Sequence, residues 1–564
     1  MGQIVNPKKR QFTDEEKKNW IITQIAALFF IVITAVFPLY IWLYEDAASG
    51  LGRYYSITHD KTLFFLMTTG AAVILLLVMM AAVKRSMSIE NYYVENEPVR
   101  LFSVAEWGLL AFIVWTFISA FVASWLHGFG DIVWWGAYNR FEGFISYACY
   151  ALTFVIIARF YKPKGWHLPL VAASAVLVSL YGVLQFLGHD IFGLFPFDVF
   201  TDEAGNPLYG PISAHFRTTL GNVNIVSAYC SFAILLFAAL FAVSRSKWQY
   251  IYLGAGMMSF ALSLTTGTSG DAHTVAILGA MLLLVPYWVS SRERLGRILI
   301  VLSSWCIVYA GQSAYLSALK RRMEAGEFFA PFDRSFLAAY SHRNIALFII
   351  LAAVLLAGGL GLLLILKKWP ERKLKTAGII FLPVALIAGL ISLEIVGSRL
   401  SDNPNNIIWQ AREMMHGRLE DDFGSARGWI WTRGISVIPD NPILGTGPDT
   451  FFFALGNDLQ VEAAERYGVV IDKAHNTFLQ IAVCMGIPAL VAYLIFLGGV
   501  FVPAAKKAFE RPLLLAFGAP ALSYTIQSFF CVEVPITTPL VWISLGVMAG
   551  EIWMSKIGYK QIEL

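Results

Sequence analysis

The uncharged run IALFIILAAVLLAGGLGLLLIL occupies residues 345–366 of this sequence. About 20 consecutive apolar residues are enough to cross the ~30 Å hydrocarbon core of a bilayer as an α-helix. A helix is the expected form because the bilayer offers no water to unpaired backbone groups. The run therefore predicts a membrane-spanning helix, and similar runs lie on both sides of it.

Comparable runs recur along the whole chain, and we count about fourteen that are long enough to span a bilayer. The composition agrees, since 57% of the 564 residues are apolar and 14% are charged, against about 45–50% and about 25% in soluble domains. The expected fold is an all-α integral membrane protein, a polytopic bundle of about 14 transmembrane helices. The predicted spans are 20–44, 62–83, 101–126, 143–161, 166–188, 221–243, 248–266, 274–290, 298–316, 345–366, 376–396, 475–501, 513–530 and 536–554.

The distribution of lysine and arginine predicts how these spans are oriented. Short loops rich in basic residues, such as those around Lys84, Lys162 and Lys506, alternate along the chain with longer, more acidic loops. Cytoplasmic loops carry the excess of basic residues, so both termini are predicted to be cytoplasmic. The predicted outer loops are 45–61, 127–142, 189–220, 317–344 and 397–474.

Three regions follow from this pattern. Residues 1–396 form a bundle of about eleven spans, residues 397–474 form an extracytoplasmic region with short helices, and residues 475–564 form about three further spans.

The net charge of +4 arises from basic residues in loops between apolar runs. This pattern sets membrane topology and argues against a nucleic-acid surface. The five cysteines lie in or beside apolar runs without paired spacing, so neither disulfides nor a metal site are expected.

Two polar stretches stand at the outer ends of predicted spans in the first half of the chain. The first, WWGAYNRFEG at 134–143, contains Arg140 and Glu142, which either form a local ion pair or bind a phosphate or sugar. The second, HFRTTLGNVN at 215–224, places Arg217 before hydroxyl side chains and asparagines. Asn222 or Asn224 is expected to cap the following helix, and a helix N-terminus also attracts anions.

A third stretch, TTGTSGDAH at 265–273, precedes the short span 274–290 and predicts a broken or tilted helix there. Asp271 and His273 either cap that helix or act in function, because ionisable groups at a membrane edge are costly unless paired or functional.

The fourth stretch is the polar island 397–474 together with His475. It contains GSARGWIWTR at 424–433 and the turn GTGP at 445–448, which lacks the lysine and spacing of a phosphate-binding loop. Arg427 and Arg433 are six residues apart, so on a regular helix they lie on different faces and do not grip one phosphate together. His475 precedes an apolar helix, where a histidine is either a hydrogen-bond partner or a catalytic base.

Taken together, these stretches resemble the O-antigen ligase and O-antigen polymerase family of bacterial membrane glycosyltransferases. The family's middle pattern is an arginine, small hydroxylated residues and Gly-Asn-Pro-Asn before a helix; here it reads RTTLGNVN at 217–224, with valine in place of proline. The late patterns correspond to SARGW at 425–429, NPILGTGP at 441–448 and HNTFLQ at 475–480. The stretch at 140–143 is similar to Gram-positive members. No single motif is specific, but four in the same order are.

This resemblance implies transfer of a glycan from a polyprenyl-diphosphate carrier to an acceptor hydroxyl on the outer face, without a metal, cofactor or nucleotide sugar. The acceptor would be a lipid, a wall polymer or a protein. His475 would be the general base. The expected donor- or glycan-binding residues are Arg217, Arg427, Arg140, Arg433, Arg399, Asn222 and Asn224. One departure is that Gly270 and Asp271 stand where many relatives carry an arginine.

Other functions are compatible with parts of the pattern. A polymerase of the same family would join lipid-linked repeat units, and only the length of the product separates it from a ligase. A transporter or flippase would place ionisable residues at mid-membrane in repeated halves, and Glu106 and Glu394, within or near spans, keep this interpretation open. A passive channel or scaffold would leave the arginine-rich island unexplained.

Overall fold

The computed structural model describes residues 14–41, 53–82, 102–187, 189, 191–192, 199–201, 207–209, 218–265, 271–324, 344–365, 368, 370–400 and 407–556. Almost all regular structure in these residues is helical. The exception is one short antiparallel hairpin, in which β1 (Val199–Thr201) pairs with β2 (Pro207–Tyr209). The predicted site residue Arg217 and also Gly270 lie outside the described residues.

The helices follow the order of the predicted spans. The first half of the chain contains α1 (Asp14–Ile31), the π-helix η1 (Val32–Val36), α2 (Arg53–Ala82), α3 (Val104–His127), α4 (Gly130–Trp135), α5 (Phe144–Phe160), α6 (His167–Phe186), the 3-10 turn η4 (Thr218–Leu220), α7 (Val223–Val243) and α8 (Gln249–Ser263). The second half contains α9 (Asp271–Leu283), α10 (Val285–Val289), α11 (Arg292–Glu324), α13 (Ile345–Leu360), η6 (Gly361–Ile365), α14 (Glu371–Ser398), α15 (Ile407–Met415), α16 (Arg427–Ser436), η7 (Ile438–Asp440), α17 (Phe451–Tyr467), α18 (Thr477–Met485), α19 (Ile487–Lys507), α20 (Pro512–Gln527) and α21 (Thr538–Lys556).

Each predicted span overlaps at least one of these helices. Nine helices of the described part are long and apolar enough to cross a membrane, and α5 and α9 are shorter apolar helices. The chain is therefore a multi-pass helical membrane protein, while the number of about fourteen spans stays a prediction. The predicted break within 274–290 is confirmed, because α9 ends at Leu283 and α10 begins at Val285.

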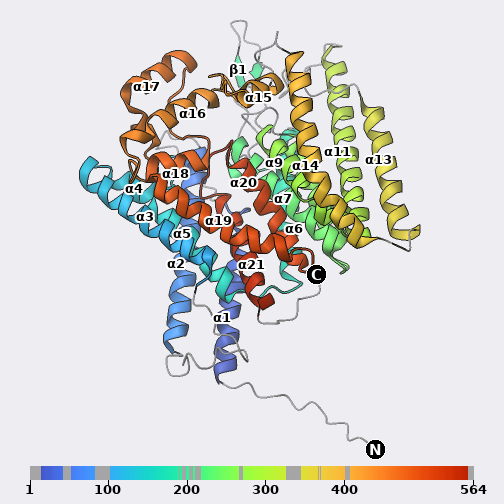
Figure 1. Cartoon of the computed structure of the whole chain (residues 1–564), viewed down its shortest axis with the longest axis horizontal. Coiled ribbons are helices and arrows are strands. Elements are labelled where there is room, and N and C mark those ends of the chain that lie inside the picture. Colours follow the sequence, from blue (N-terminus) through green and yellow to red (C-terminus); the bar gives the residue numbers. More distant parts are fainter. Residues whose placement is uncertain are drawn as a thin grey trace, which may run out of the picture.

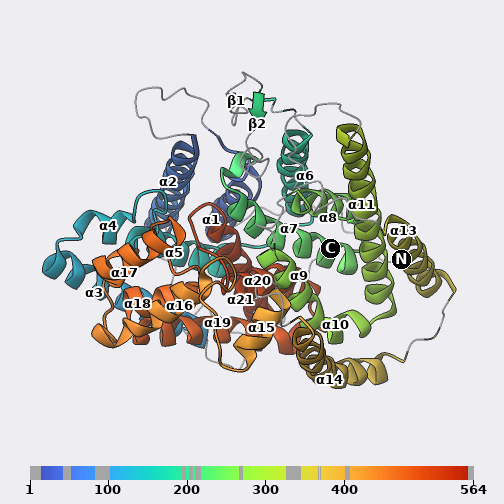
Figure 2. The ribbon, with the colours of Figure 1, turned by 90° about the horizontal axis from the view of Figure 1, so that it is seen from above.

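The core and the lipid-facing rim differ clearly in burial. The span of α7 is completely buried, and α7 packs against α8, α9, α11 and α20 near the centre of the view in Figure 2. In contrast, the most apolar window of α14 has no buried residues, and α14 lies at the edge of the molecule in the same view. An apolar helical segment without buried residues is explained by contact with lipid.

The polar island folds into helices on one side of the molecule. Figure 1 shows α15, α16 and α17 together at the top, next to α18. The helices α16 and α17 contact each other and both contact α18. The island is therefore a packed cap on the bundle, placed directly over the start of α18.

The predicted single span 475–501 is wrong, because it is divided into α18 and α19 at Gly486. Gly486 has φ 84°, and a Cβ there would lie 2.0 Å from the carbonyl oxygen of Ile443. The second residue of α19 is a proline, which suits a helix start. The backbone N–H groups of Gly447 and Ile487 donate to the carbonyls of Cys484 (2.7 Å) and Pro442 (2.9 Å). The turn at 441–448 therefore packs into the break between α18 and α19.

Candidate active site

The loop before α18 fixes the position of His475. Its neighbour Ala474 donates its N–H to the side-chain oxygen of Gln480 (2.8 Å) and accepts a hydrogen bond from the indole N–H of Trp431 (3.1 Å). On the other side, Asn476 caps α18 by accepting from the N–H of Leu479 (3.0 Å). His475 itself has φ 49°, a left-handed conformation that is uncommon for a residue with a side chain. The imidazole is thus held at the N-terminus of a helix, in a backbone conformation imposed by its neighbours.

A buried cluster of one lysine and two carboxyl groups lies beside this loop. The side chain of Lys473 is 2% exposed, and its Nζ lies 2.7 Å from Glu142 Oε2 and 2.5 Å from Asp449 Oδ1. The second oxygen of Asp449 accepts the backbone N–H groups of Ala137 (2.7 Å) and Glu142 (3.1 Å). The cluster therefore joins the segment before α5, the turn before α17 and the loop before α18.

Arg140 forms a second link between the same segments. Its Nε and Nη2 donate to the two carboxylate oxygens of Asp472 at 2.7 and 3.2 Å. The local Arg140–Glu142 ion pair that the sequence allowed is therefore replaced by two long-range pairs, Arg140 with Asp472 and Glu142 with Lys473. A two-point guanidinium–carboxylate contact is among the stronger polar contacts in proteins.

The electrostatics of the cluster follow from burial and from these pairs. Burial and, to a smaller extent, the nearby charges of Arg427 and Arg140 together lower the pKa of His475 to about 3. Burial raises the pKa of Glu142, and the neighbouring ammonium group of Lys473 opposes this rise. Burial alone would lower the pKa of Lys473, but Asp449 and Glu142 outweigh it and raise that pKa. At neutral pH His475 is thus an unprotonated imidazole, as a proton acceptor must be.

A small cavity opens between His475 and this cluster. Its walls include Glu142, Lys473, His475 and Glu533, and its volume is about 10 Å³. This is close to the minimum space for one water or hydroxyl group. The Oε1 atom of Glu142 is buried and has no hydrogen-bond partner among the described residues. The cavity thus lies among ionisable side chains and has about the size of one hydroxyl group.

Glu533 enters from the loop between α20 and α21. It accepts a hydrogen bond from the hydroxyl of Ser528 (3.1 Å), and the carbonyl of Ser528 in turn accepts from the N–H of Thr477 (2.8 Å). Burial raises the pKa of Glu533 to about 7. A carboxyl group that titrates near neutral pH in a polar cavity is a candidate for proton transfer.

The predicted arginines of the island have different surroundings. Arg427 donates through Nε to the carbonyl of Phe530 (2.8 Å) and through Nη1 to that of Gly424, and it is close enough to His475 to affect its pKa. Arg433 instead pairs with Glu462 (3.0 Å) and stacks over the ring of Trp429. The two guanidinium groups thus have separate partners, as their six-residue spacing predicts.

The remaining predicted residues lie in other parts of the fold. Arg399 is exposed at the C-terminal end of α14. Asn222 is the N-cap of α7, and its side chain accepts from the N–H of Asn224 (2.8 Å), which confirms the predicted capping. The preceding turn η4 packs against α2, α6 and α7.

Sequence reasoning did not assign roles to Lys473, Asp449 or Glu533. A usable signal existed for two of them. Lys473 lies four residues before α18, and Glu533 is an acidic residue in the apolar loop CVEVP at 531–535. Ionisable groups in such positions require a partner or a function. Asp449 follows a turn, and nothing in its local sequence distinguishes it from an ordinary turn residue.

The two acidic residues that favoured a transporter have local partners. Glu106 Oε2 accepts from the backbone N–H of Ser103 (2.6 Å) at the start of α3, and Oε1 lies 2.5 Å from Arg159. Glu394 pairs with Arg412 (2.8 Å) and His416 (2.7 Å) near the C-terminal end of α14. Both carboxylates are explained by contacts at helix ends.

The site described above lies largely within one recognisable sequence region. Residues 349–494, about a quarter of the chain, match the family described as O-antigen ligase. This match supports the resemblance to the O-antigen ligase family that the motifs indicated. The matched region includes His475, Lys473, Asp449, Arg427, Arg433 and Arg399. The match and the apolar helices support the description of the chain as a transmembrane protein similar to the glycosyltransferases of polysaccharide biosynthesis. No curated protein matches the chain.

Within the described part of the chain, no group of three or more His, Cys, Asp or Glu side chains is arranged to hold a metal ion. Between the carboxyl groups of Glu142 and Asp449, the position that a cation would take is filled by the ammonium group of Lys473.

Proposed function

We propose that this protein transfers a glycan from a polyprenyl-diphosphate carrier to an acceptor hydroxyl, as O-antigen ligases do. The observation that carries the proposal is the water-sized cavity at His475, a residue of the region that matches the ligase family. The basic loops at the opposite helix ends favour an outward-facing site with both termini in the cytoplasm.

The reaction is a displacement at the anomeric carbon. The acceptor oxygen forms a bond to this carbon while the bond to the diphosphate oxygen breaks, and the diphosphate leaves with the electron pair. The acceptor proton passes to His475, whose position at a helix start beside the cavity suits this role. Arg427 and Arg140 flank His475 and stabilise the negative charge that develops on the diphosphate. Arg217, Arg433, Arg399, Asn222 and Asn224 are further proposed contacts for the donor or glycan.

Binding of the donor would also make His475 a stronger base. Besides burial, the charges of Arg427 and Arg140 hold the pKa of His475 low. A diphosphate beside these arginines offsets their positive charge and so raises the pKa of the imidazole. A bound donor would thus remove part of what holds this pKa low, whereas burial, the larger cause, would remain.

Replacing Arg427 by alanine is expected to weaken donor binding by about 10- to 100-fold, since a hydrogen bond to a charged group contributes about 1.5–3 kcal/mol. Binding of a polyprenyl-diphosphate glycan to the purified protein measures this effect. Arg466→Ala is the matched control, because Arg466 is an exposed arginine of the same region that pairs with Asp421. Equal donor affinity in both variants and the wild type would remove Arg427 from the donor site.

Glu533 is proposed to stabilise the imidazolium that forms when His475 takes the proton. The pKa of Glu533 is about 7, and only its ionised form, present above that pH, can perform this role. The rate of transfer is therefore expected to rise with pH through about 7, and this rise should be absent in Glu533→Gln. A rate profile between about pH 5 and pH 9 measures it. The exposed Glu465→Gln variant should retain the wild-type profile, and a retained rise in Glu533→Gln would refute the role.

A polymerase of lipid-linked repeat units is the second candidate, because it uses the same donor and the same displacement. The cavity at His475 accepts a hydroxyl from either kind of acceptor. Analysis of product length in a purified reaction separates the two functions: a ligase transfers each glycan once, whereas a polymerase gives a ladder of lengthening chains.

A further inference from the structure

A second, much larger cavity lies at the other end of the transmembrane helices. Its volume is about 490 Å³, within the range of about 300–1,000 Å³ that is usual for small-molecule sites. Four helices contribute to its walls: α3, α5, α19 and α21. The lining includes Arg159, Ile495, Gly498, Val502, Trp553 and Lys556.

This cavity is separate from the candidate active site. Glu142 directly precedes α5, whereas Arg159 is near the C-terminal end of the same helix. A helix rises about 1.5 Å per residue, so the 17 residues of α5 separate the two places by roughly 25 Å. The cavity also lies at the C-terminal ends of α19 and α21, and His475 lies before the start of α18.

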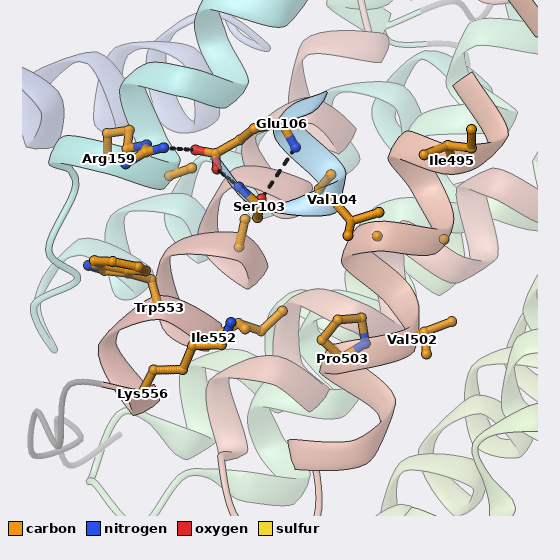
Figure 3. Close-up of a pocket in the computed structure, with 15 residues that line it drawn as sticks. Ser103, Val104, Glu106, Arg159, Ile495, Val502, Pro503, Ile552, Trp553 and Lys556 are labelled. Carbon is orange, nitrogen blue, oxygen red and sulfur yellow. Dashed lines mark hydrogen bonds and ion pairs between the residues drawn. The ribbon is translucent and has the colours of Figure 1, made fainter. Parts of the chain in front are cut away.

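The lining is apolar at one end and basic at the other. Figure 3 shows Arg159, Trp553 and Lys556 on one side of the cavity, with Ile495 and Val502 on the opposite side. Tryptophan and basic side chains with this arrangement are typical of the depth where lipid headgroups meet hydrocarbon. The span of α3 begins at Val104 and that of α19 ends at Lys507, so the cavity occupies the boundary of the membrane.

The charges at the basic end exceed the acidic charges there. The carboxylate of Glu106 accepts a hydrogen bond from the backbone at the start of α3 and also pairs with Arg159. Glu551, the other acidic group nearby, forms an ion pair with Arg511 (3.1 Å). Lys556 adds a further positive charge at the mouth, and within the described residues it has no acidic partner. An anion is therefore the complementary occupant of this end.

We propose that the cavity binds a phospholipid with an anionic headgroup. One acyl chain lies along Ile495 and Val502, and the phosphate group lies between Arg159 and Lys556. Basic pockets between transmembrane helices are suited to anionic headgroups, and an apolar cavity open at the membrane boundary is suited to the attached chain. The lipid joins α3 and α5 to α19 and α21 at the end of the molecule that is remote from the site of transfer.

Two variants test the two ends of the cavity separately. Lys556→Ala removes a headgroup contact, and Lys506→Ala is its control, since Lys506 is an exposed lysine nearby that does not line the cavity. Gly498→Leu fills the apolar end: no atom lies within 4 Å of the place that a Cβ at Gly498 would take. Leucine is also a better helix former than glycine, so this variant is expected to fold.

The experiment is native mass spectrometry of the purified full chain, titrated with phosphatidylglycerol or with zwitterionic phosphatidylcholine. The wild type and Lys506→Ala should bind phosphatidylglycerol more tightly than phosphatidylcholine. Lys556→Ala should lose about fivefold in affinity for phosphatidylglycerol alone, and Gly498→Leu should lose binding of both lipids at this site. Thermal unfolding establishes that each variant is folded. Equal binding of the two lipids by the wild type, unchanged binding in folded Gly498→Leu, or displacement of phosphatidylglycerol by a polyprenyl phosphate would each overturn the proposal.

Discussion

Replacing His475 by alanine is expected to lower the rate of glycan transfer by about 10²- to 10⁴-fold, the usual contribution of a positioned general base. The loop around it should persist, because Gln480 and Trp431 hold the backbone of Ala474 and Asn476 caps α18. The assay is transfer of a labelled glycan from a polyprenyl-diphosphate donor by the purified protein in vesicles. Affinity for the donor should change much less than the rate.

Two further variants make this result interpretable. His475→Asn keeps a residue that tolerates the left-handed backbone conformation at this position, so its loss of activity cannot be ascribed to the backbone. His416→Ala removes a half-exposed histidine that pairs with Glu394 and should leave transfer intact. Near wild-type transfer by a folded His475→Asn protein would show that His475 is not the base.

The second large effect is expected from Lys473→Met, which leaves Glu142 and Asp449 buried without their cation. Loss of one partner from a buried ion pair typically costs about 3–5 kcal/mol of folding free energy. Thermal unfolding of the detergent-solubilised protein should therefore begin at a clearly lower temperature. Arg466→Ala breaks a surface pair in the same region and should cost no more than about 1 kcal/mol.

A second substitution identifies the cause of this loss. In the Lys473→Met background, Glu142→Gln removes a carboxyl group that has lost its cation, so it should restore part of the stability. The same Glu142→Gln change in the wild-type background should destabilise the protein. Unchanged unfolding of Lys473→Met, or additive losses in the double variant, would mean that the cluster does not join these loops energetically.

The helical segments were accessible from the sequence because the bilayer requires long apolar runs. The break at Gly486 could not be predicted from the sequence, since residues 475–501 are almost uniformly apolar. Its cause is tertiary: the turn at 441–448 occupies the break, and the indole of Trp115 and the hydroxyl of Ser119 hold the carbonyls of Ile443 and Leu444 at 2.9 and 2.6 Å.

The candidate site was accessible only in part. The order of the family motifs indicated His475, Arg140 and Arg427, which the structure brings close together. The ion pair between Lys473 and Glu142 joins residues 331 positions apart, and local sequence carries no information on such a pairing. Arg140 and Glu142 illustrate the difficulty, because they are neighbours in sequence and each has its partner in the loop before α18.

The most direct test of transferase function uses the purified protein in vesicles that contain a polyprenyl-diphosphate glycan and an acceptor with a free hydroxyl. Free polyprenyl diphosphate is expected to appear in equal amount to the glycan attached to the acceptor, and His475→Asn is expected to abolish both. Movement of intact donor between the leaflets, with no cleavage of the glycosyl–phosphate bond, would contradict transferase function and identify a transporter.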